Sequence, residues 1–98
     1  KELNAGWFVF GTKSELKEQK IIEDGEVLRG DFNKGYFTKI DIRMDKEIKL
    51  YSKYAKMLTS HPISSYTLQK DINKQYVLQI TDPQQFWSTS KYLVILVK

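Results

Sequence analysis

His61 is the residue with the most versatile chemistry in this sequence, because it is the one histidine and the chain has no cysteine. Nucleophilic catalysis usually pairs a serine or cysteine with a histidine base, and zinc sites need clustered histidine and cysteine ligands. Ser60 and Pro62 flank His61, but adjacency in sequence does not create a catalytic geometry. We therefore interpret His61 as a hydrogen-bonded turn residue.

Acid–base catalysis of the glycosidase kind needs two carboxyl groups several ångströms apart, one of them with a raised pKa. Asp82 precedes Pro83 and is suited to capping a helix, and Asp41 falls on the predicted outward face of a strand. The sequence also lacks calcium-loop spacing and a glycine-rich phosphate loop. We predict a protein that is not an enzyme and uses no metal or cofactor. The carboxylates that qualify for catalysis by type alone are Asp41, Asp45, Glu47 and Asp82.

Binding chemistry has more candidates than catalysis. Tyr51, Tyr54 and Tyr76 lie in segments predicted to be exposed, and they could form a platform for protein, sugar or a single nucleic-acid strand. The alternative is that these tyrosines are scattered surface residues. The tripeptide from Arg29 to Asp31 matches a motif that integrins recognise at loop tips, although its central glycine also suits an ordinary turn.

The formal net charge of +4 invites the idea of a nucleic-acid partner. Only Arg29 and Arg43 among the 16 basic residues are arginine, however, whereas base readout and bidentate phosphate contacts favour arginine. The lysines are spread along the whole chain, as on a solvated surface. This distribution argues against nucleic acid as the partner.

The length of 98 residues predicts one globular domain over residues 1–98. No apolar run approaches the roughly 18 residues of a membrane-spanning helix. The chain begins Lys1-Glu2-Leu3, without an initiator methionine or a signal-peptide pattern. We expect it to be a processed product or an excised piece of a longer protein.

Two apolar runs predict strands buried on both faces, at the centre of the sheet system. Residues 7–10 form the first run, and residues 92–97 form the second, which we expect beside or near the first. Alternation over residues 36–43 points Tyr36, Thr38, Ile40 and Ile42 inward. Residues 48–51 alternate in the same way, which predicts a hairpin between the two segments.

Two local signals predict short helices. Thr12 and Glu15 match a capping box ahead of a helix at about residues 13–19. Asp82 followed by Pro83 predicts a single helical turn that carries Phe86 and Trp87. Residues 55–58 suit a strand or a helical turn. Together these elements predict a mainly β fold with α+β decorations, an antiparallel-rich β-sandwich or partly open barrel of six or seven strands and two short helices.

The resemblance of this chain to known proteins rests on residues 11–17, residues 36–42, residues 58–62 with 65–66, and residues 86–88 with 90–95. These stretches resemble the C-terminal domain of a group of Bacteroidetes lipoproteins, some described as collagen-binding adhesins. The resemblance spans nearly the whole chain and implies that it is the C-terminal part of a longer protein. It implies an extracytoplasmic location, at the cell surface or in the periplasm, with a lipid anchor outside this segment. It implies no binding residues.

We therefore expect a non-catalytic interaction or adhesion module that binds protein or glycan. One alternative is a structural cap for a preceding coiled coil, whose most apolar surface would lie near Leu3. Another is a basic domain that binds single-stranded nucleic acid, which predicts lysines converging with tyrosines among them.

Overall fold

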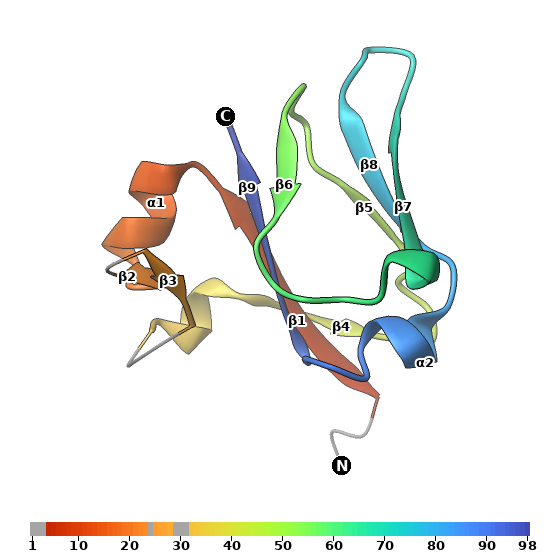
Figure 1. Ribbon diagram of the computed structural model, residues 1–98, viewed down its shortest axis with the longest axis horizontal. Coiled ribbons are helices and arrows are strands. Elements are labelled where there is room, and N and C mark those ends of the chain that lie inside the picture. Colours follow the sequence, from red (N-terminus) through yellow and green to blue (C-terminus); the bar gives the residue numbers. More distant parts are fainter. Residues whose placement is uncertain (1–3, 24, 29–31) are drawn as a thin grey trace.

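The computed structural model describes residues 4–23, 25–28 and 32–98, and it shows a mainly β fold with short helices (Figure 1). Nine strands form three sheets within these residues. Seven of them correspond to the six or seven strands predicted. The other two, β2 (Ile22–Glu23) and β3 (Glu26–Val27), form a two-residue antiparallel pair beside the first helix.

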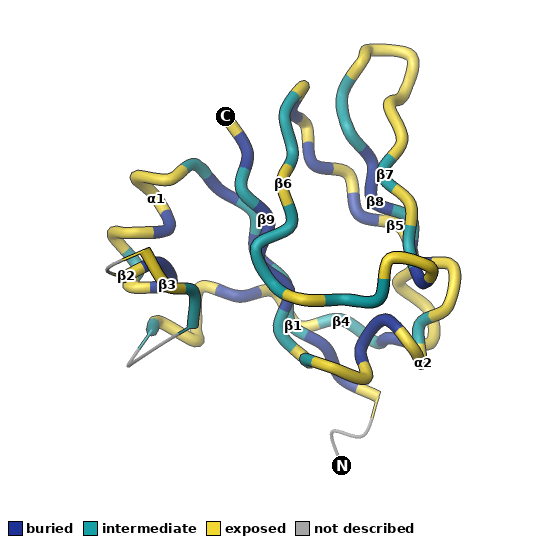
Figure 2. Tube along the Cα trace, in the orientation of Figure 1, coloured by how far each residue is buried: buried dark blue, intermediate teal, exposed yellow. Residues whose placement is uncertain are grey.

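The larger sheet has the order β4-β1-β9-β6 and contains the two strands that the apolar runs predicted. Its central strands pair in parallel, with Phe8 opposite Leu93, which confirms that the second run lies beside the first. Figure 2 shows buried segments along both. The strands of this sheet are β1 (Ala5–Gly11), β4 (Thr38–Asp41), β6 (Ala55–Met57) and β9 (Tyr92–Val97).

A second sheet has the order β5-β8-β7 and faces the first across the main core. The segment 55–58, predicted as a strand or a helical turn, forms strand β6 of the first sheet. A 3-10 helix, η2 (Ile63–Ser65), follows Pro62 before the chain enters the second sheet. The second sheet consists of β5 (Glu47–Lys49), β7 (Tyr66–Lys70) and β8 (Tyr76–Ile80), all paired antiparallel.

Both predicted helices form where their capping residues stand. In α1 (Lys13–Glu18) the Thr12 hydroxyl accepts from the Glu15 amide, and the Glu15 carboxylate accepts from the Thr12 amide. In α2 (Pro83–Phe86) the Asp82 carboxylate accepts from the Gln85 amide. These caps satisfy amides that the first helical turn leaves without partners.

The apolar side chains form two cores, one on each face of the larger sheet. The main core lies between the sheets and includes the fully buried Phe86 and Trp87 from the α2 turn. The smaller core lies on the other face, where α1 contributes Leu16 and β9 contributes Val94. Two cores explain why β1 and β9 are apolar on both faces.

The predicted hairpin between residues 36–43 and 48–51 is wrong. Strand β4 pairs with β1 in one sheet, whereas β5 pairs with β8 in the other, so the intervening segment crosses between sheets. The prediction of which residues in this segment point inward was also partly wrong. Tyr36 and Thr38 are exposed, whereas Phe37 is buried in the smaller core. Because the protein has a second core, either face of such a strand can be buried. The prediction from alternation assumed a single core on one face.

Residues 34–36 form a further 3-10 helix, η1 (Lys34–Tyr36), which the Asn33 side chain caps by accepting from the Gly35 amide. No helix in the described part of the chain is long and apolar enough to cross a membrane.

Candidate functional site

The three tyrosines predicted as binding residues belong to segments that meet at one end of the molecule. Figure 1 shows the C-terminal residue, the start of β6 and the β7–β8 hairpin at this end. Tyr51 and Tyr54 lie in the β5–β6 connection, and Tyr76 begins β8. The main-chain amide of Tyr76 donates to the carbonyl of Ser52, which joins the segments directly.

Ser52 organises this end of the protein, although no local sequence pattern indicates its role. Its buried hydroxyl lies 2.9 Å from the Tyr54 carbonyl and 3.1 Å from the Tyr54 amide. The same oxygen lies 3.2 Å from the carbonyl of Lys98 and 3.5 Å from its amide. A residue 46 positions away in the chain is thereby tied to the β5–β6 connection.

Two lysines lie over two of the tyrosine rings. The Lys98 ammonium lies 4.5 Å from the centre of the Tyr54 ring, and the Lys70 ammonium lies 5.2 Å from that of Tyr76. Cations are attracted to the negative faces of aromatic rings at such distances. We call these two lysines, together with Tyr51, Tyr54 and Tyr76, the tyrosine–lysine end.

The three tyrosines differ in exposure more than the sequence predicted. Tyr51 is 69% exposed, whereas Tyr54 and Tyr76 are only partly exposed, and Tyr76 packs against the main core. The adjoining tip of the β7–β8 hairpin presents Ile72, which is 96% exposed. This end therefore offers apolar surface and ammonium groups side by side.

The charge of this end is positive. Lys53 in the β5–β6 connection and Lys74 in the β7–β8 turn are exposed. The carboxylate of Asp71 in the same turn accepts from the amides of Asn73 and Gln75. Asp71 is thus engaged in forming the hairpin turn. An anionic partner with some apolar surface matches this arrangement best.

Arg29 and Asp31, the ends of the integrin-type tripeptide, lie outside the described residues. The tyrosine–lysine end is therefore the part of the predicted site that the structure assembles.

His61 is hydrogen bonded on both ring nitrogens, as predicted for a turn residue. Nδ1 lies 2.8 Å from the Phe86 carbonyl, so it carries the proton, and Nε2 lies 2.8 Å from the Thr59 hydroxyl. That hydroxyl also accepts from the Val94 amide, which leaves its proton for Nε2. The imidazole stacks on the Phe86 ring with centres 4.1 Å apart. These contacts describe a neutral histidine that holds a connection onto β9.

Burial lowers the pKa of His61, although its hydrogen bond to the Phe86 carbonyl partly opposes the shift. The lowered pKa favours the neutral form, in which Nδ1 donates to the Phe86 carbonyl and Nε2 accepts from the Thr59 hydroxyl. Its nitrogens and the Thr59 hydroxyl all have partners in this network, so we assign the group a structural role.

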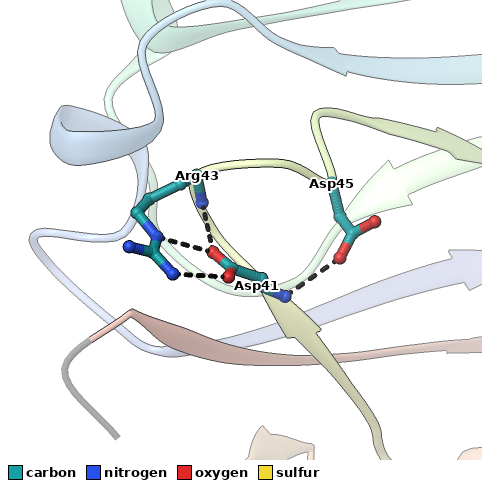
Figure 3. Close-up of polar contacts among 3 residues, drawn as sticks. All are labelled: Asp41, Arg43 and Asp45. Carbon is teal, nitrogen blue, oxygen red and sulfur yellow. Dashed lines mark hydrogen bonds and ion pairs between the residues drawn. The ribbon is translucent and has the colours of Figure 1, made fainter.

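Asp41 and Asp45 both line a hollow of about 360 Å³, where a pair of carboxylates could do chemistry. Figure 3 shows the two side chains with Arg43 at the turn after β4. The Asp41 carboxylate accepts from the main-chain amide of Arg43 and from its guanidinium at 2.9 and 3.1 Å. The side chain of Asp45 accepts from the Asp41 amide. The carboxylates thus bond to the turn rather than to each other.

The hydrogen bonds from Arg43 lower the pKa of Asp41 to about 2. A general acid needs the opposite shift, because it must hold a proton near neutral pH. We therefore assign Asp41 to the turn that ends strand β4. Among the described residues, no group of three or more histidine, aspartate and glutamate side chains is placed to hold a metal ion.

Comparisons of the chain with protein-family models, with curated proteins and with solved structures found no match.

Proposed function

We propose that this chain is a non-catalytic interaction domain of an extracytoplasmic lipoprotein and that it binds an acidic protein segment through the tyrosine–lysine end. The observation that carries the binding role is that Ser52 joins the segments of Tyr54 and Tyr76, whose rings lie under the ammonium groups of two lysines, Lys98 and Lys70. The extracytoplasmic location rests on the resemblance to lipoprotein domains.

The contacts favour an acidic, partly apolar ligand for two physical reasons. Ammonium groups attract anions and speed their association, especially at low salt. Exposed tyrosine supplies contact area with little loss of side-chain entropy, and aromatic residues are enriched at protein interfaces. Tyr51 is the ring most available for such contact.

Titration of the ¹⁵N-labelled chain with a glutamate-rich peptide that contains leucine tests the proposal. We expect amide shifts at Tyr51, Tyr54 and Tyr76, with affinity that falls as salt rises. A heparin fragment and an oligothymidylate serve as parallel probes for an acidic glycan and for nucleic acid. Tighter binding of either probe would replace the acidic protein segment as the partner.

Charge reversal locates the site. The double variant Lys70→Glu/Lys98→Glu should weaken peptide binding by about tenfold or more, because two attractive groups become repulsive. Lys13→Glu/Lys17→Glu changes the same charge on the exposed face of α1 and should leave the affinity unchanged. Equal weakening by both variants would show nonspecific charge attraction and refute the site, and a peptide that does not bind at low salt refutes the proposal.

A further inference from the structure

Strand β5 forms an edge of the second sheet, because the strand order is β5-β8-β7. The register places Ile48 opposite Leu78, and hydrogen bonds link Lys46 with Ile80 and Leu50 with Tyr76. Hydrogen-bonded pairs recur at every second residue in an antiparallel ladder. Residues 46, 48 and 50 therefore direct their main-chain groups toward β8.

Glu47 and Lys49 must consequently direct their amides and carbonyls away from β8. In the described part of the chain, no hydrogen bond engages these four groups. An edge of this kind is a template for another strand. It adjoins a groove of about 420 Å³ lined by the aliphatic and aromatic side chains of Phe8, Phe10, Ile40, Ile48 and Tyr51.

The outer edge of β4 differs in this respect, although it borders the same groove. The amide of Asp41 donates to the Asp45 carboxylate (Figure 3). The Asp41 carbonyl accepts from the amides of Met44 and Asp45. The turn thus occupies the outward main-chain groups of Asp41, at the end of β4. The turn therefore hinders the pairing of an added strand with the end of β4, whereas no such turn covers the outer edge of β5.

The charges of β5 specify a partner strand. If a second β5 lies antiparallel with Ile48 opposite Ile48, Glu47 of each copy stands opposite Lys49 of the other. Those are the residues whose main-chain groups point outward, so each of the two pairs can exchange two hydrogen bonds. Both side chains are exposed. The edge is therefore complementary to itself in hydrogen bonding and in charge.

We propose that two copies of this chain associate through their β5 edges into a symmetric dimer with a continuous six-stranded sheet. A two-fold axis through Ile48 makes the interface isologous, as in most protein dimers. The added strand would also cover the groove beside Phe8 and Phe10, which are only partly buried in the single chain. The other edge of the sheet, β7, carries one charged residue, Lys70, and has no such complementarity.

Sedimentation equilibrium over a wide concentration range, with the 98-residue chain, measures the association. The mass should rise from 11.6 kDa toward twice that value, and added salt should favour the monomer. Glu47→Lys and Lys49→Glu each turn two attractive cross-strand pairs into repulsive ones. Each should raise the dimer dissociation constant by about tenfold or more, and the double variant should restore dimerisation.

Hydrogen exchange identifies the edge directly. The amides of Glu47 and Lys49 should exchange slowly when the chain is concentrated and fast when it is dilute, while the Ile48 amide stays protected by β8 in both. Circular dichroism of the variants checks that they fold. A chain that stays monomeric at about millimolar concentration overturns the proposal, as does a dimer in which the double variant fails to associate. The lysine variants that test the proposed function leave β5 intact.

Discussion

Replacing Ser52 by alanine should release the chain end from the tyrosine–lysine end. The hydroxyl contacts both main-chain groups of Tyr54 and of Lys98, but it has one proton and two acceptor sites. It can therefore make about three hydrogen bonds at once, and the contact with the Lys98 amide, at 3.5 Å, is long.

The expected loss follows from this count. A typical hydrogen bond contributes about 1 kcal/mol net, and a buried group left without a partner costs about 1–3 kcal/mol. Ser52→Ala should lower the free energy of unfolding by about 2 kcal/mol. For a domain of this size, that corresponds to a melting temperature about 8–16 °C lower.

Urea unfolding followed by tryptophan fluorescence measures the change, because Trp87 is buried in the main core. Ser88→Ala is the matched control, since its hydroxyl makes a single hydrogen bond at an exposed position and should matter little. The reasoning is refuted if Ser52→Ala and Ser88→Ala destabilise the chain equally, by less than about 0.5 kcal/mol.

Two further predictions concern the main core and its histidine. Gly6→Ala should destabilise the fold by about 1–3 kcal/mol, because the new Cβ would lie 2.9 Å from Ile42 and 3.2 Å from the Trp87 ring; an unchanged urea midpoint contradicts this packing. The pKa of His61 is lowered in the folded chain, so below the ordinary pKa of 6.5 the unfolded chain binds more protons than the folded chain. Stability should therefore fall as the pH drops through 6.5 and stay level above it. Urea midpoints between pH 5 and 8 test this, and His61→Gln should show a smaller fall over that range.

Local sequence signals determined both helices. A capping box spans four residues, from Thr12 to Glu15, and the cap at Asp82 is equally short, so no distant contact is needed to specify either. The central position of β1 and β9 was also predictable, because runs that are apolar at every position need cover on both faces.

The tertiary structure alone decided how the remaining strands pair. The segments on either side of residues 44–46 have the alternation of a hairpin. In the structure they do not pair with each other, because β4 pairs with β1 and β5 pairs with β8. The presence of a second core decided that Phe37 is buried. Alternation shows that two faces differ, but it does not show which strand or core will cover them.

The candidate site shows the same division. Tyrosine is a residue type that suits binding, and this made Tyr51, Tyr54 and Tyr76 candidates in the sequence. Their grouping depends on Ser52, whose hydroxyl reaches a residue 46 positions away. The lysines over the rings come from β7 and from the end of the chain, which no local pattern brings together. Sequence determines what short segments can do by themselves, whereas contacts between distant segments exist only once the whole chain has packed.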